Sequence, residues 1–293
     1  MPKKNHRGLF VRILLLILFA VGFWLRTLPT TKTPSGETAW RPWTTTRTIT
    51  LYFSDGRFLF PVSRRMQSND DLPVRTLEAL LAGPNRAGRL KNTIPPGIRI
   101  RSFKLDDGVA HIDLSAFPDS ESMYAAETAI VQTMTAVHGV NSVELSIEGK
   151  TVKADARRTP LLYFASAGGM VAVPAPALNP RDALERYLSG PPTSDLTGLP
   201  PDVRLLAYDY NSADRLLTLK FSYTPSLRTL AIDRPDRMRT VLLGLIASLT
   251  EFPEVRAVNL DFGGQTRLGL GQCSDLLRTP QPRPGLLNDE RLL

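Results

Sequence analysis

The chain of 293 residues is long enough for about two domains, and its 42% hydrophobic and 22% charged residues exclude a chain that is disordered throughout. Its formal net charge of +8 would suit nucleic acid or anionic lipid, but no basic run with interleaved aromatics follows the first dozen residues, so no nucleic-acid partner is expected. The single cysteine, Cys273, excludes an intrachain disulfide and a cysteine-based metal cluster.

The first part of the chain has the features of a membrane anchor. Residues 1–7 form a short basic tail with Lys3, Lys4 and Arg7, and residues 8–25 are apolar except for Arg12. At about 1.5 Å per residue, a helix over 8–25 would be roughly 27 Å long, close to the thickness of a bilayer core. Because the positive charges precede the apolar stretch, the sequence predicts a single-pass helix in the cytoplasmic membrane, with the N-terminus inside and the later domains extracytoplasmic.

A cleaved signal peptide is the alternative interpretation of the same stretch. Cleavage requires small residues just after the apolar core, whereas Phe23-Trp24-Leu25 are bulky and the small residues Ala20 and Gly22 lie within it. These residues favour an anchor, and whether the helix is cleaved stays open. Residues 26–46 are rich in Thr and Pro and have no apolar periodicity, so we predict a linker there.

The rest of the chain repeats itself, since five short blocks recur in the same order at offsets of 105 to 115 residues. The first copies of these blocks begin at Leu51, Thr76, Ile94, Val109 and Val140, and the second copies at Leu162, Ala183, Leu199, Leu216 and Val255. The sequence therefore predicts two homologous domains, copy one at residues 47–155 and copy two at residues 158–268. Because the period is much longer than that of a solenoid, we expect separate beads rather than a stacked array.

Periodicity within copy one predicts a series of short elements. Strands are expected over residues 46–53, 58–62, 98–105, 109–114 and 142–147, and helices over residues 73–82 and 120–137. Asp106-Asp107-Gly108 is a hairpin signal, and Gly83-Pro84 should end the first helix. Copy two follows this plan, with a helix over 238–249 and a last strand over 257–262.

The predicted fold class is α+β, in which the helices of each copy pack on one face of a small mixed or antiparallel sheet. Residues 269–293 contain Pro280, Pro282 and Pro284 among charged residues. We predict that this last segment is a disordered tail.

No group of residues has the spacing of a catalytic or metal site. The three histidines do not form a zinc-binding pattern, and the two adjacent carboxylates of Asp106 and Asp107 fall short of a calcium loop. His111, Asp113 and Ser115 alternate along one predicted strand and can share a face, which leaves a hydrolase as a remote alternative.

Copy two does not keep this trio. Its equivalent positions hold Thr218, Lys220 and Ser222, so a structural role is favoured, in which the Ser115 hydroxyl ends the strand. Cys273 likewise has no catalytic signature around it. We therefore predict a protein that is not an enzyme, with no catalytic residues, no metal site and no cofactor.

Several of the repeated blocks resemble the GerMN (germane) domain family. The resemblance is carried by Leu51-Tyr52-Phe53, the helix from Leu77 to Pro84, Ile94-Pro95-Pro96-Gly97 and the strand from Val109 to Ser115. It covers residues 47–268 and is stronger in copy one than in copy two. It implies an envelope-facing domain with a fold akin to ring-building modules, which works through protein–protein contacts and has no enzymatic activity.

The lead hypothesis is a membrane-anchored envelope protein that assembles or stabilises a transenvelope complex of sporulation or germination. Its partners would be envelope proteins, including further copies of itself, bound at exposed sheet edges. The alternative is a protein that binds a cell-wall glycan or a small ligand at the outer surface of the cytoplasmic membrane. All three tryptophans precede residue 44, so neither copy offers a tryptophan platform for a glycan.

Overall fold

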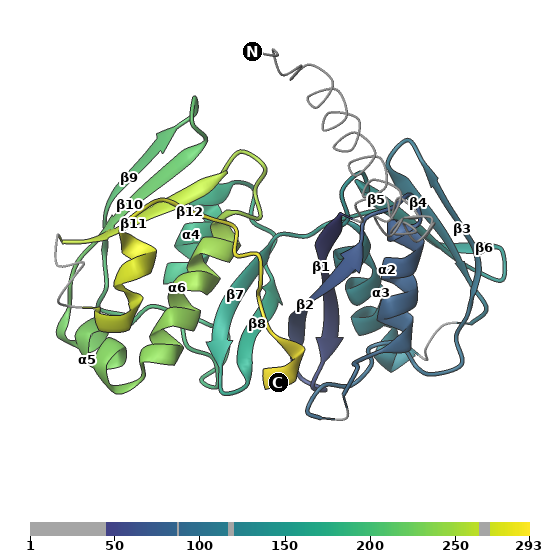
Figure 1. Ribbon diagram of the computed structural model, residues 1–293, viewed down its shortest axis with the longest axis horizontal. Coiled ribbons are helices and arrows are strands. Elements are labelled where there is room, and N and C mark those ends of the chain that lie inside the picture. Colours follow the sequence, from purple (N-terminus) through teal and green to yellow (C-terminus); the bar gives the residue numbers. More distant parts are fainter. Residues whose placement is uncertain (1–44, 87, 117–119, 264–269) are drawn as a thin grey trace, which may run out of the picture. The chain divides into compact units, whose positions relative to one another are not determined.

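The computed structural model describes residues 45–86, 88–116, 120–263 and 270–293. The predicted basic tail at 1–7, the anchor at 8–25 and the linker up to residue 44 lie outside these ranges. Within the described ranges, no helix is both long and apolar enough to cross a bilayer. The description below concerns the unit that begins at Thr45 (Figure 1).

Copy one contains a hairpin, two helices and a four-stranded sheet. The hairpin is formed by β1 (Thr46–Ser54) and β2 (Leu59–Gln67) and is followed by α2 (Leu72–Ala82). The sheet contains, in spatial order, β3 (Ile100–Asp106), β4 (Val109–Leu114), β5 (Ser142–Ile147) and β6 (Lys150–Arg157). The helix α3 (Ser120–Met134) connects β4 to β5, which are parallel, while the other neighbours are antiparallel, so the sheet is mixed.

Local sequence signals explain where these elements begin and end. A proline occupies the first turn of α2, where no intrahelical N–H is required, and the helix ends at Gly83, whose φ is 83°. Asp107 and Gly108 have φ values of 47° and 81°, as a two-residue turn between β3 and β4 requires. Both turn predictions are confirmed. The sequence pattern did not predict the strand β6, because almost all of its residues are exposed.

Copy two repeats this plan with two changes. Its elements are β7 (Leu161–Ser166), β8 (Gly169–Pro174), α4 (Pro180–Leu188), β9 (Leu205–Asn211), β10 (Leu216–Phe221), α6 (Pro235–Leu249) and β11 (Ala257–Phe262). An additional helix, α5 (Pro225–Asp233), precedes α6. The outer sheet has the order β12-β11-β10-β9, so the two-residue strand β12 (Gln281–Pro282) takes the place that β6 has in copy one.

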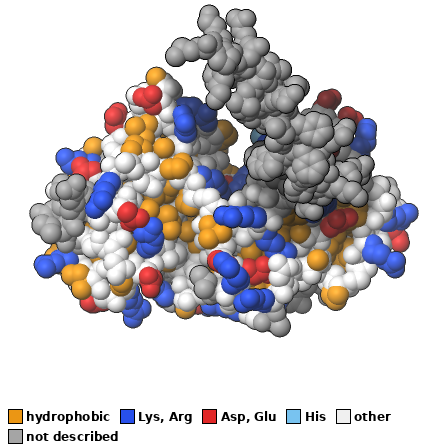
Figure 2. Space-filling model, in the orientation of Figure 1, with side chains coloured by type: hydrophobic (Ala, Val, Ile, Leu, Met, Phe, Trp, Pro, Cys, Tyr) orange, Lys and Arg blue, Asp and Glu red, His pale blue; other side chains and the backbone are white. Residues whose placement is uncertain are grey.

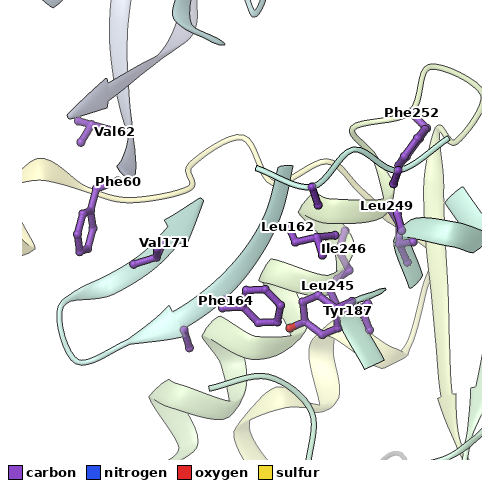
Figure 3. Packing of buried hydrophobic residues seen from close by; sticks show 14 of the residues in the cluster. Phe60, Val62, Leu162, Phe164, Val171, Tyr187, Leu245, Ile246, Leu249 and Phe252 are labelled. Atoms are coloured by element: carbon purple, nitrogen blue, oxygen red, sulfur yellow. The ribbon is translucent and has the colours of Figure 1, made fainter. Parts of the chain in front are cut away.

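The two copies share a sheet, and the prediction of separate beads is wrong. The hairpins β1–β2 and β7–β8 form one sheet of order β1-β2-β8-β7 (Figure 1). The pairing between the copies is short, since β2 and β8 are in register only at Leu59 and Ala172. One hydrophobic cluster extends over both copies, as Figure 3 shows for Phe60 and Val62 of β2 and Val171 of β8.

The strands of the shared sheet bury side chains on both faces. Because successive residues of a strand point to opposite faces, Leu51 and Phe53 lie on one face of β1 and Tyr52 lies on the other. Tyr52 packs in a second hydrophobic cluster that combines residues of both copies. Its members are Tyr52 and Ala129 of copy one, Leu161, Tyr163, Met170, Ala172 and Ala247 of copy two, and Leu287 near the C-terminus.

The prediction of a disordered tail over 269–293 is also wrong, because residues 270–293 form fixed contacts with both copies. A 3-10 helix, η1 (Gly271–Leu277), buries the side chain of Cys273 and is followed by β12. Residues 281–293, here called the C-terminal strap, then lead from copy two to copy one. A second short 3-10 helix, η2 (Glu290–Leu292), ends the strap.

Asn288 is the centre of the C-terminal strap. Its side-chain amide donates to the carbonyl oxygens of Pro61 in β2 and Met170 in β8, each at 2.8 Å, and its oxygen accepts from the Met170 N–H at 2.8 Å. One side chain therefore binds the backbones of both copies beside the short β2–β8 pairing. Farther along, Glu290 accepts from the Arg64 guanidinium at 2.9 Å, in an ion pair that is largely buried.

Candidate functional site

The structure gives His111, Asp113 and Ser115 separate partners. The Ser115 hydroxyl accepts the backbone N–H of Arg99 at 3.0 Å, and the Ser222 hydroxyl accepts that of Arg204 at 2.8 Å in copy two. Both copies thus use the serine to hold the end of the strand, which confirms the structural role favoured for Ser115. No hydrogen bond links two members of the trio in the part of the chain that is described.

His111 and Asp113, the other two members of the trio, each contact different residues of copy one. The His111 Nδ1 lies 3.3 Å from the Glu144 Oε2, and the Asp113 carboxylate accepts the Gly149 N–H at 2.9 Å. Arg101 approaches the same carboxylate at 3.5 Å. Among the described residues, no group of His, Cys, Asp and Glu could hold a metal ion.

A polar cluster that the sequence did not indicate lies where the two copies meet. This junction cluster consists of Tyr52, Arg158, Tyr163, Glu251 and Arg283. The two tyrosines are the middle residues of the repeated Leu-Tyr-Phe block, and their hydroxyl oxygens are 3.1 Å apart. Their surroundings are also equivalent, since the Tyr52 N–H donates to the hydroxyl of Thr133 in α3, and the Tyr163 N–H to that of Ser248 in α6.

Glu251, just after the end of α6, holds the junction cluster together. Its side chain is 1% exposed. Arg158 donates to both of its carboxylate oxygens, from Nε at 2.7 Å and from Nη2 at 2.8 Å. The Arg283 guanidinium approaches at 2.6 Å, and the Tyr163 hydroxyl donates at 2.7 Å. These three side chains come from the segment between β6 and β7, from the C-terminal strap and from β7, so the carboxylate joins parts that are distant in sequence.

The charge states of the junction cluster follow from burial and pairing. Burial by itself would raise the pKa of Glu251, but Arg158 and Arg283 outweigh it, and the pKa of this carboxyl lies below its ordinary value. Burial raises the pKa of Tyr52 and Tyr163, so both phenols are neutral hydrogen-bonding groups. The cluster therefore holds two positive charges and one negative charge.

The junction cluster opens to solvent through a cleft of about 470 Å³. Its lining comes from both copies and from the C-terminal strap. The residues that line it are Thr48, Thr50, Thr135, Ala136, Arg158, Thr250, Glu251, Pro253, Arg283, Pro284 and Gly285. We call this feature the junction cleft. Among the described residues that line it, Glu251 is the only one with an acidic side chain.

Two sheet edges form a second candidate surface. The strand β3 is at one edge of the outer sheet in copy one, and β9 is at the equivalent edge in copy two. Figure 1 shows the β9–β10 hairpin and the β3–β4 hairpin on opposite sides of the described unit. Each edge strand exposes a large side chain at an equivalent position, Leu105 paired with Ala110 and Tyr210 paired with Leu217.

These features define a class of protein, a tandem α+β repeat in which two related copies are joined by a common sheet. The chain belongs to the Germane family, described as sporulation and spore germination, whose model matches residues 50–153 and again residues 161–268. The resemblance stated from the repeated blocks is thereby confirmed. No curated protein sequence matches the chain.

Solved structures include a related tandem arrangement. The tandem GerMN domains of the sporulation protein GerM from Bacillus subtilis superpose with a TM-score of 0.62 at 16% identity, over 84% of this chain and 99% of that one. The first GerMN domain of the same protein matches with a TM-score of 0.32 at 15% identity, over 40% of this chain and 95% of that one. The tandem match shows that the fold is that of paired GerMN domains.

Proposed function

We propose that this chain is a non-enzymatic, membrane-anchored protein of the cell envelope that assembles or stabilises a complex of sporulation or germination through protein–protein contacts. Membership of the Germane family and the tandem arrangement shared with a sporulation protein support the biological setting. The proposal places the N-terminus in the cytoplasm and both copies outside the cytoplasmic membrane.

The observation that carries the docking role is the pair of equivalent edge strands. An edge strand presents unpaired backbone donors and acceptors, to which a partner strand can add. The open edges at β3 and β9 carry Leu105 and Tyr210, which are 39% and 37% exposed. Because the shared sheet and the C-terminal strap join the copies, one partner assembly would meet both edges at a fixed spacing, which favours bivalent binding.

The distribution of charge supports the anchor. Residues 1–44 contain seven Lys and Arg residues and one acidic residue, so they account for most of the net charge of +8. The remaining residues are nearly balanced, and Figure 2 shows Lys and Arg side chains distributed among acidic ones over the face in view. Of the basic residues, Lys3, Lys4 and Arg7 directly precede the apolar stretch at 8–25, and positive charge at that place is typical of the cytoplasmic flank of a membrane helix.

The partners of the serine and histidine side chains support a non-enzymatic role. A nucleophilic serine requires a base within hydrogen-bond reach and an access path to substrate. Ser115 instead accepts a backbone N–H, and its counterpart Ser222 makes the same contact in copy two. Both copies use this serine in the same way, although only copy one has the histidine. We therefore assign the serine a role in stabilising the fold.

Site-specific photocrosslinking in cells tests the docking proposal. The crosslinking residue would replace Ser102 in β3 or Ala207 in β9, with exposed Glu78 in α2 as the control position. We expect crosslinks to envelope proteins from both edge positions in sporulating cultures, and none from position 78. Equal crosslinking from all three positions, or crosslinks to wall fragments alone, would contradict docking at the edges.

A further inference from the structure

We propose that the junction cleft binds a carboxylate-bearing ligand, with the outward edge of the Arg158 guanidinium as its main donor. This inference goes beyond docking at the sheet edges, because it concerns a different surface and does not depend on it. The volume of about 470 Å³ lies in the range of roughly 300–1,000 Å³ that is usual for small-ligand pockets.

The first argument is the balance of charge. Two guanidinium groups face one carboxylate, and buried charges are normally paired. Arg283 is matched on two sides, by Glu251 and by the carbonyl oxygen of Ala247 in the last turn of α6, which accepts at 3.1 Å. Arg158 uses Nε and Nη2 on Glu251, and its Nη1 has no hydrogen-bond partner among the described residues. The Arg158 side chain is 22% exposed and lines the junction cleft, which brings its guanidinium within reach of a ligand there.

The second argument is the row of donors that leads into the junction cleft. Thr48, Thr50 and Tyr52 alternate along β1 and therefore share one face, with Tyr52 at the inner end of the row. The cross-strand partner of Thr48 is the exposed Arg65 of β2, which adds a guanidinium on the same face. A ligand carboxylate can thus receive hydrogen bonds from Arg158 at the floor and from threonine hydroxyls at the wall.

The opposite wall limits the strength of anion binding. The Thr135 and Thr250 hydroxyls donate to the carbonyls of Val131 and Ile246 in their own helices, at 2.6 and 2.7 Å. These helix ends bring a partial negative charge, and at α6 Arg283 offsets it through its hydrogen bond to the Ala247 carbonyl. The Arg158 guanidinium is the charged group of the junction cleft with a nitrogen left over for a ligand, and a carboxylate is a suitable partner for it.

Calorimetric titration of the full chain in detergent micelles at fixed ionic strength tests this inference. The probes are N-acetyl-aspartyl-amide for an acidic side chain, N-acetyl-glycine for a chain terminus and succinate for a free small carboxylate. N-acetyl-asparaginyl-amide is the uncharged match of the first probe. We expect saturable binding of at least one carboxylate probe and no binding of the asparaginyl probe. The carboxylate probe that binds most tightly identifies whether the ligand group is an acidic side chain, a chain terminus or a small free carboxylate.

The variant Thr48→Glu localises the binding. Thr48 is exposed, so the substitution should be tolerated, and it places a carboxylate of the chain itself at the junction cleft. We expect affinity to fall at least about tenfold, the contribution of one charge-assisted hydrogen bond. Thr229→Glu adds the same charge at an exposed position of α5 and should leave binding unchanged. Equal binding of aspartyl and asparaginyl probes, or an equal loss in both variants, would overturn the inference.

Discussion

Glu251 is the acidic member of the junction cluster, in which Arg158 and Tyr163 donate to it and Arg283 forms an ion pair with it. The two guanidinium groups are only partly exposed, at 22% for Arg158 and 33% for Arg283. Removing one partner of a buried pair leaves the other charge without compensation, which costs more than the pair itself contributes. The stability of the junction therefore depends on this single carboxylate.

We predict that Glu251→Gln lowers the free energy of unfolding by about 3 kcal/mol, at the lower end of the range for breaking buried pairs because both arginines reach some solvent. Urea denaturation of the full chain in micelles would measure it. Glu254→Gln, at an exposed position three residues on, should change stability by less than about 0.5 kcal/mol. A similar loss of stability in both variants would contradict the dependence of the junction on the Glu251 carboxylate.

The pH dependence of the same variant has a definite sign. The pKa of Glu251 is lowered in the folded state, so its contribution is present above the ordinary glutamate pKa of about 4.3 and is lost as pH falls through the folded value. The stability difference between the wild type and Glu251→Gln should therefore be constant from neutral pH to about pH 5 and should shrink below about pH 4. A difference that stays constant down to pH 3 would exclude this linkage.

At the scale of single elements, α6 lies unusually close to β7. A Cβ added at Gly244 would be 2.3 Å from the carbonyl oxygen of Tyr163. That oxygen belongs to a buried strand and cannot rotate away, so α6 would have to move. The position four residues later, Ser248, holds the Tyr163 N–H, which fixes the helix against the strand at a second point.

We predict that Gly244→Ala destabilises the protein by about 1–2 kcal/mol, although alanine normally favours a helix interior by up to about 1 kcal/mol. The clash exceeds the helix propensity because the neighbour is backbone. Gly88→Ala is the matched control, since nothing lies within 4 Å of its added Cβ and the residue is exposed. Thermal unfolding of both variants would measure the two changes in stability. A higher stability of Gly244→Ala than of the wild type would show that α6 can move away from β7 without cost.

Element by element, the sequence predicted what is local and missed what is long-range. The Asp107-Gly108 turn, the end of α2 at Gly83 and most of the strands and helices depend on neighbouring residues and were found, whereas β6 and α5 were not. The β2–β8 pairing depends on two hairpins separated by about a hundred residues, and a period of 111 between their Leu-Tyr-Phe blocks does not say whether they meet.

The junction cluster was missed for the same reason. Arg158 and Glu251 are 93 residues apart, and neither belongs to a sequence motif that would bring them together. One sequence signal for the cluster was available, because a tyrosine stands in the middle of the otherwise apolar Leu-Tyr-Phe block in both copies. The C-terminal strap was interpreted as disorder because it is rich in proline and charge, whereas its order comes from the hydrogen bonds of Asn288 and Glu290 to groups far away in the chain.

At the scale of the whole molecule, the shared sheet makes the two copies depend on each other. Their direct strand pairing is limited to one register position, and the two hydrophobic clusters and the C-terminal strap supply further contact. Asn288 and the Arg64–Glu290 ion pair connect the strap to copy one, while β12 connects it to copy two.

We predict that deleting residues 286–293 loosens the junction without unfolding either copy. Hydrogen exchange should accelerate in β2 and β8, and little in β4 and β10, which are internal to their own sheets. The variant Leu286→Ala is the control, since this strap residue is 57% exposed and makes no side-chain contribution to the junction cores. Faster exchange throughout both copies would instead mean that the strap is needed for the folds themselves.

The position of Asn288 in the chain has a consequence for the order of events during synthesis. Every strand that it joins is made earlier, and the residue that secures β2 to β8 leaves the ribosome after all of them. We expect a chain truncated before Asn288 to fold both copies while the contact between β2 and β8 stays open to proteases. Synthesis of Asn288 therefore comes before the two edge strands are held at a constant separation.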